Sequence, residues 1–123
     1  LIVRKVENDR AFFRLNVNVD ASVIGLPPFD AAEKACRLVN ISIGGAYIFS
    51  EEKYAIGSKF MLRVKLLEDR PESVLLCEVL RVIEKDEEAG YEYGCRFLEI
   101  TEEDQQNITQ DMFAIQSKKL DIC

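Results

Sequence analysis

Two arginines stand four residues apart near the start of the chain, and a polar hexapeptide follows about 26 residues later. The even spacing of Arg10 and Arg14 puts their side chains on one side of an extended segment. A planar guanidinium can fork onto a phosphate or onto guanine O6 and N7, and it can stack on a purine face. The pair is therefore suited to hold an anion that carries phosphate or purine groups.

The hexapeptide has the pattern Asn-x-Ser-x-x-Gly and ends an alternating run. Asn40 and Ser42 are expected side by side on the outward face of one strand, offering an amide and a hydroxyl to a guanine edge or a phosphate oxygen. Gly45 is expected to turn the backbone with a positive φ and to leave room for a ligand. Each motif alone is weak, because surface arginines and polar residues before glycines are common in turns.

The segments that must position these residues have the alternation of short β-strands. Six strands are expected, over residues 14–23, 36–43, 46–49, 59–67, 73–84 and 91–98. In the second strand, Val39, Ile41 and Ile43 are expected to face the core. The fifth has apolar residues on both faces, which predicts a strand between the barrel interior and a cover that a late helix could supply.

A helix is expected over residues from about 102 to 119. Thr101 and Asp104 form a capping-box-like start, and the acidic first turn suits the positive end of the helix dipole. The apolar stripe consists of Ile108, Met112 and Ile115. Together these elements predict an all-β fold, a closed or split six-stranded antiparallel β-barrel with a C-terminal α-helix.

Composition limits the possible functions. The chain has 123 residues, the size of one domain, and 48% hydrophobic and 31% charged residues are typical of a globular protein. The net charge of −6 argues against non-specific DNA or RNA binding, because such binding requires a broad basic surface. No apolar run approaches the roughly 18 residues of a membrane span, so no membrane insertion is expected. Because the chain opens on Leu1, a fragment of a longer protein with an upstream domain is expected.

The chain is not expected to be an enzyme or to hold a metal or cofactor. It has no histidine, which removes the usual general base, and its four cysteines lack metal-ligand spacing. Cys36, Cys77, Cys95 and Cys123 are expected to be small buried side chains in a reducing cytosol, which places the protein in the cytoplasm.

The two motifs together, in this order and at this spacing, resemble the RxxxR and (D/N)xSxxG signature of the PilZ domain family. Residues 93–97 also resemble the strand that closes the family's barrel. The resemblance covers nearly the whole chain and implies a six-stranded barrel with a C-terminal helix. It implies that the chain binds the bacterial second messenger cyclic di-GMP. The implied ligand-binding residues are Arg10, Arg14, Asn40, Ser42 and Gly45.

The resemblance also implies a division of labour along the chain. Residues 1–14 would be a linker or switch segment, and residues 15–123 would hold the barrel, about 15–98, and the helix. Ligand binding would order the segment and rearrange domains or a partner, such as a flagellar, pilus or polysaccharide-synthesis protein in motility or biofilm formation. Asp9 stands where many members carry a further arginine, which disfavours a second stacked ligand.

Two other functions remain open from the sequence. A degenerate barrel could serve as a protein-interaction module that binds no nucleotide. An oligonucleotide-binding barrel would fit the topology, but it conflicts with the acidic charge and with the lack of an aromatic, basic groove.

Overall fold

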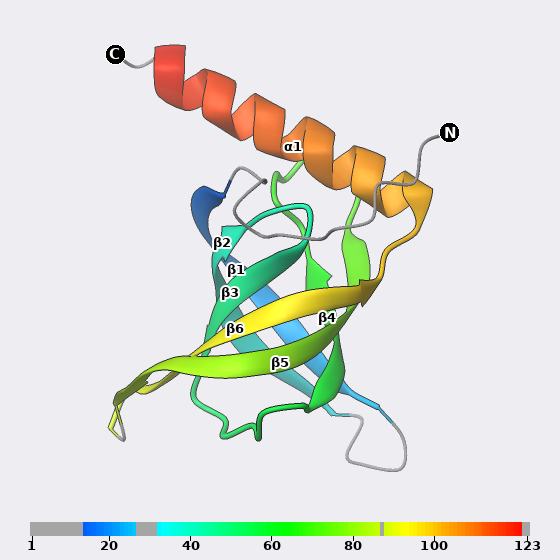
Figure 1. Cartoon of the computed structure of the whole chain (residues 1–123). Helices are drawn as coiled ribbons and strands as arrows, with labels where there is room; N and C mark the ends of the chain where they lie inside the picture. Colours follow the sequence, from blue (N-terminus) through cyan, green and yellow to red (C-terminus); the bar gives the residue numbers. More distant parts are fainter. Residues whose placement is uncertain (1–13, 27–31, 87, 122–123) are drawn as a thin grey trace.

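The structure is a computed structural model that describes residues 14–26, 32–86 and 88–121, without the side chains of residues 84–85 and 118–121. Within these residues, six antiparallel strands close into a barrel in the order β1-β2-β3-β6-β5-β4. The strands are β1 (Leu15–Gly25), β2 (Glu33–Ile41), β3 (Gly45–Ser50), β4 (Lys59–Val64), β5 (Ser73–Asp86) and β6 (Gly90–Glu99). The helix α1 (Glu102–Asp121) lies across one end of the barrel (Figure 1). The predicted fold class is confirmed.

The barrel interior is built from rows of inward side chains that run across neighbouring strands. One row is Leu15, Ile41, Ala46, Cys95 and Val79, each paired with the next across β1, β2, β3, β6 and β5. All five are buried, with exposed fractions of 0 to 4%. Because successive side chains on a strand point to opposite faces, the neighbouring row must lie on the outside of the barrel.

Bulges in β1 and β2 interrupt the alternation that the sequence predicts. The register of β1 shifts around Asn18, which has a positive φ of 53°, and the register of β2 shifts around Val39. A bulge places two residues opposite one and so changes which side chains face inward. Leu38 and Ile41 are consequently buried, whereas Val39 at the bulge is half-buried. Ile43, which follows the end of β2, is also half-buried. The prediction that Val39 and Ile43 face the core beside Ile41 is wrong.

The helix α1 begins as the sequence predicts. The hydroxyl oxygen of Thr101 accepts a hydrogen bond from the backbone N–H of Asp104 at 3.1 Å, which caps the first turn. Ile108 and Met112 are buried against the barrel, and Ile115 packs partly against the same core. The predicted apolar stripe is confirmed.

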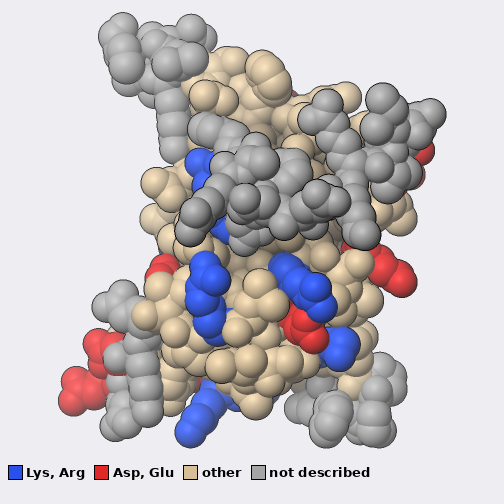
Figure 2. All heavy atoms as spheres, viewed as in Figure 1, with Lys and Arg blue, Asp and Glu red and all other residues tan. Residues whose placement is uncertain are grey.

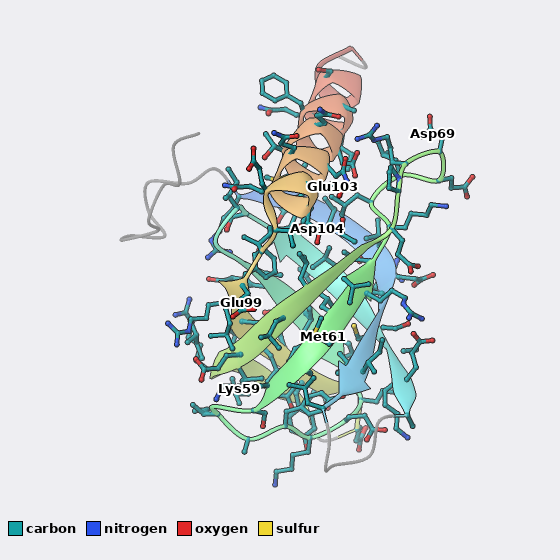
Figure 3. All side chains as sticks on the ribbon, turned by 90° about the vertical axis from the view of Figure 1, so that its right-hand side faces the viewer. Lys59, Met61, Asp69, Glu99, Glu103 and Asp104 are labelled. Carbon is teal, nitrogen blue, oxygen red and sulfur yellow. The ribbon has the colours of Figure 1, made fainter. Side chains whose placement is uncertain are left out.

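The loop between β4 and β5 fastens α1 to the barrel. Arg70 Nε donates to Asp111 Oδ1 at 2.6 Å, and Arg70 Nη2 donates to Gln110 Oε1 at 2.9 Å. The Asp111 side chain is only 2% exposed. Figure 3 shows this loop, with Asp69 labelled, rising beside the helix.

The outer face of β5 is not covered by α1, contrary to the sequence-based expectation. The helix lies over the end of the barrel, while four large apolar side chains on β5 are 37 to 41% exposed. These are Val74, Leu80, Val82 and Ile83.

Three of the four cysteines are buried and free of disulfides, as predicted. They are Cys36, Cys77 and Cys95; Cys123 lies outside the described residues. Among the described residues, no group of acidic or cysteine side chains has the geometry of a metal site. No helix in the described part of the chain has the length and apolar character needed to span a membrane.

Candidate ligand-binding surface

A row of outward positions crosses the barrel wall directly beside the buried row. The register pairs Asn16 with Asn40, Asn40 with Tyr47, Tyr47 with Gly94, and Gly94 with Arg81. A bulge between Val79 and Arg81 on β5 keeps Arg81 in this row. The row therefore connects five strands on one outer surface of the barrel.

Basic side chains gather on the face formed by β3, β6 and β5. Figure 2 shows Lys and Arg side chains over the middle of this face, with most of the visible acidic side chains nearer its margins. One carboxylate on it, Glu78, is already paired, since Arg96 Nε lies 2.8 Å and Lys59 Nζ 3.6 Å from its oxygens. In a chain with a net charge of −6, this face is a local cationic surface.

The structure brings Arg14 and Asn40 together from distant parts of the chain. Arg14 Nη1 donates to Asn40 Oδ1 at 3.3 Å, and the Arg14 guanidinium carbon lies 4.5 Å from the centre of the Tyr47 ring. This distance is within the range of a cation–π interaction. Arg14 is thereby held at the mouth of β1, over the outer surfaces of β2 and β3.

Ser42 does not face outward beside Asn40, and that prediction is wrong. Strand β2 ends at Ile41, and Ser42 turns into the protein with 1% of its surface exposed. Its hydroxyl oxygen accepts hydrogen bonds from the backbone N–H groups of Gly44 and Gly45, both at 3.2 Å. Ser42 therefore shapes the turn between β2 and β3.

Gly45 is required for a different reason from the one the sequence suggested. The φ angle of Gly45 is not positive. Among the described glycines, Gly57 and Gly90 have a positive φ. A Cβ atom on Gly45 would instead lie 2.2 Å from the carbonyl oxygen of Cys95 on β6. The missing side chain allows β3 to approach the backbone of β6 closely. Arg10, the remaining predicted residue, lies outside the described residues.

Sequence reasoning missed two residues on this surface, Tyr47 and Arg81. Arg81 Nη2 donates to the Tyr47 hydroxyl oxygen at 2.8 Å, and the Arg81 guanidinium carbon lies 5.7 Å from the ring centre. Tyr47 could have been found, because it stands two residues after Gly45 on the same strand. Arg81 could not, because its position depends on the strand order and on a bulge.

The family comparison agrees with this arrangement. A PilZ domain model matches residues 8–114, most of the chain. The chain belongs to the PilZ domain family. The match includes both motifs from which the resemblance was predicted, and that prediction is confirmed. No curated protein sequence matches the chain significantly.

Solved structures show the same PilZ fold at low sequence identity. The PilZ domain of Escherichia coli YcgR with c-di-GMP is 16% identical, with a TM-score of 0.70 over 91% of this chain and 95% of that one. Bacillus subtilis MotI (DgrA), an inhibitor of motility, is 20% identical, with a TM-score of 0.71 over 91% of this chain and 53% of that one. The Klebsiella MrkH–c-di-GMP complex is 16% identical, with a TM-score of 0.67 over 97% and 54%. The chain thus spans about half the length of MotI and MrkH.

Proposed function

We propose that this PilZ domain is a receptor for cyclic di-GMP, which it binds on the outer surface of β2, β3 and β6. The observation that carries the proposal is the position of Arg14, which contacts Asn40 and Tyr47 on that surface. Arg10 would act with Arg14 from the preceding segment, while Ser42 and Gly45 would form the turn beside the ligand. Ligand-bound structures of YcgR and MrkH, which share the fold, support the choice of ligand.

The chemistry of the residues fits this ligand. A cyclic dinucleotide has two phosphates and two purines, and a guanidinium can hydrogen-bond to either group. Hydrogen bonds to charged groups contribute about 1.5 to 3 kcal/mol each, so two arginines could supply a large share of the roughly −8 kcal/mol of a micromolar complex. The remaining contacts would orient the bases.

The biological role follows from the switch segment. Residues 1–14 would be a linker that ligand binding orders against the barrel, which would reposition an upstream domain or a protein partner. The partner would be a flagellar, pilus or polysaccharide-synthesis protein in a cytoplasmic pathway that controls motility or biofilm formation. The domain would act as a receptor and not as an enzyme.

Calorimetric titration with cyclic di-GMP tests the proposal. The intact protein should bind, Arg14→Ala should abolish measurable binding, and Arg10→Ala should weaken it strongly. Arg37→Ala is the matched control, because Arg37 is an arginine on β2 that is paired with Asp20 at 2.9 Å. GTP and cyclic di-AMP are the ligand controls.

The second candidate is a degenerate PilZ barrel that binds proteins and no nucleotide. The exposed apolar side chains on β5 favour it, because apolar surface of this kind often marks protein contacts. Absence of heat from the intact protein in the titration would favour this candidate over the receptor.

A further inference from the structure

Arg81 differs from four other described arginines in how its charge is compensated. Four described arginines lie within 4 Å of a carboxylate: Arg37, Arg63, Arg70 and Arg96. Among the residues whose side chains are described, Arg81 has no carboxylate partner and donates to the Tyr47 hydroxyl instead. Within the described side chains this guanidinium therefore has no counter-ion, and it is available to an acceptor from outside.

Tyr47 is placed to hold two guanidinium groups at once. The Arg14 carbon lies 4.5 Å and the Arg81 carbon 5.7 Å from the centre of the Tyr47 ring. Two guanidinium groups beside one ring repel each other, so an electron-rich ring and a bound anion would both favour the arrangement. The Tyr47 hydroxyl oxygen also accepts from Arg81, so one side chain holds Arg81 by a hydrogen bond and Arg14 by its ring.

Gly94 on β6 leaves room for the Arg81 side chain to extend across the outer surface of the barrel toward Tyr47. Gly94 stands between Tyr47 and Arg81 in the row, paired with both. A Cβ on Gly94 would lie 3.3 Å from Arg81 Cγ and 3.4 Å from Arg81 Nε, so a side chain there would crowd the arginine stem. The glycine lets Arg81 lie flat over β6 and reach Tyr47.

We propose that Arg81 contacts the ligand and reads the O6/N7 edge of a guanine, and that Tyr47 is a positioning residue for both Arg14 and Arg81. This inference rests on the proposed function. One N–H of Arg81 is used on Tyr47, and the guanidinium has others for a forked contact. Guanine presents two acceptors at that edge, whereas adenine presents a donor amino group that conflicts with a guanidinium. Arg81 therefore makes the surface selective for guanine over adenine.

The first test combines a residue change with ligand changes. Arg81→Ala should weaken cyclic di-GMP about tenfold, within the roughly 5- to 150-fold of a forked base contact. Cyclic di-IMP keeps O6 and N7, so it should lose affinity by the same factor. Cyclic di-AMP, measured by competition, should lose none. Arg63→Ala, an arginine change on β4, is the control and should bind all three ligands as the intact protein does.

The outcomes separate this inference from the receptor proposal. If the intact protein does not bind cyclic di-GMP, the receptor proposal fails and this inference with it. If the intact protein binds and Arg81→Ala binds equally well, only the contact by Arg81 is rejected. An equal loss for cyclic di-GMP and cyclic di-AMP would overturn the reading of guanine, because a phosphate contact would not distinguish the bases.

The role of Tyr47 needs a test that simple loss of packing would not mimic. Tyr47→Phe keeps the ring beneath Arg14 and removes the hydroxyl that holds Arg81, so it should weaken cyclic di-GMP by less than Arg81→Ala does. Adding Tyr47→Phe to Arg81→Ala should have no further effect, since the hydroxyl then has no arginine to position. Additive losses would overturn the positioning role, with unfolding midpoints in urea as the check that each variant folds.

Discussion

At the scale of single residues, Ser42 shows how a polar side chain in a binding motif can act from inside the protein. Its buried hydroxyl satisfies the N–H groups of Gly44 and Gly45. Ser42→Ala leaves both donors without this partner, and each unsatisfied buried group costs about 1 to 3 kcal/mol. The free energy of unfolding in urea should fall by about 2 kcal/mol. Ser22→Ala, a half-buried serine on β1, should change it by less than about 0.5 kcal/mol; equal effects would contradict the role of Ser42.

Gly45 gives a second prediction, which depends on close approach between strands. In Gly45→Ala the added methyl meets the Cys95 carbonyl oxygen at 2.2 Å, so the β3–β6 pairing must move. We expect a loss of about 3 kcal/mol or more in urea unfolding, the upper range for overpacking. Gly57→Ala is the comparison, because Gly57 has a φ of +91° and open space around it, and a left-handed residue costs about 1 to 2 kcal/mol. A smaller loss at Gly45 than at Gly57 would refute the steric explanation.

These residues also show what the sequence could predict at this scale. Neither Arg14 nor Asn40 alone predicted that they meet, because surface arginines and amides at turns are common. The two motifs together, through their resemblance to the PilZ signature, placed them in one site. The orientation of Ser42 could not be predicted, since it depends on where β2 ends. The reason for Gly45 lies in the backbone of β6, about 50 residues later in the chain.

At the scale of elements, the contact between Arg70 and Asp111 decides how firmly α1 is held. Asp111 is 2% exposed, so Arg70→Ala would leave a buried carboxylate without its partner. Breaking a buried pair costs about 3 to 5 kcal/mol, and because Arg70 is 31% exposed we expect about 2 to 3 kcal/mol. In Arg70→Ala, amide hydrogen exchange should accelerate relative to the intact protein, and the acceleration should be larger in α1 than in the barrel strands.

The matched control is the exposed pair of Arg37 and Asp20, whose side chains are 49% and 93% exposed. Arg37→Ala should cost at most about 1 kcal/mol, because exposed ion pairs contribute little. If Arg70→Ala and Arg37→Ala destabilise the protein equally, Arg70 does not anchor the helix.

The strands and the helix could be predicted because the spacing of apolar residues along the sequence indicates which side chains are buried. Six strands and one helix were found near their observed bounds, and the helix stripe matches the residues that pack on the barrel. Bulges were not predictable, since an extra residue leaves no mark on a pattern of apolar and polar types. The cover expected over β5 was inferred from its second apolar face, but a helix that starts after β6 closes the end of the barrel.

At the scale of the whole molecule, closure of the barrel buries three thiols in one core. Burial raises the pKa of Cys36 and Cys95 to about 12 and also raises the pKa of Cys77. In the unfolded chain a thiol has a pKa of about 8.5. The folded state therefore retains its thiol protons at pH values where the unfolded state has lost them.

The sign of the resulting pH dependence follows from these raised pKa values. Stability from the protonated thiols is complete below about pH 8.5, and it is lost as the pH rises toward 12, because ionisation favours the unfolded chain. Each thiol contributes up to about 1.4 kcal/mol per pH unit in this window. Urea midpoints at pH 7.5, 9 and 10.5 should fall progressively in a Cys123→Ser background, and adding Cys36→Ala should reduce the slope. If Cys36→Ala leaves the slope of the urea midpoint against pH unchanged, the Cys36 thiol titrates alike in the folded and unfolded states. The core would then admit water to this thiol.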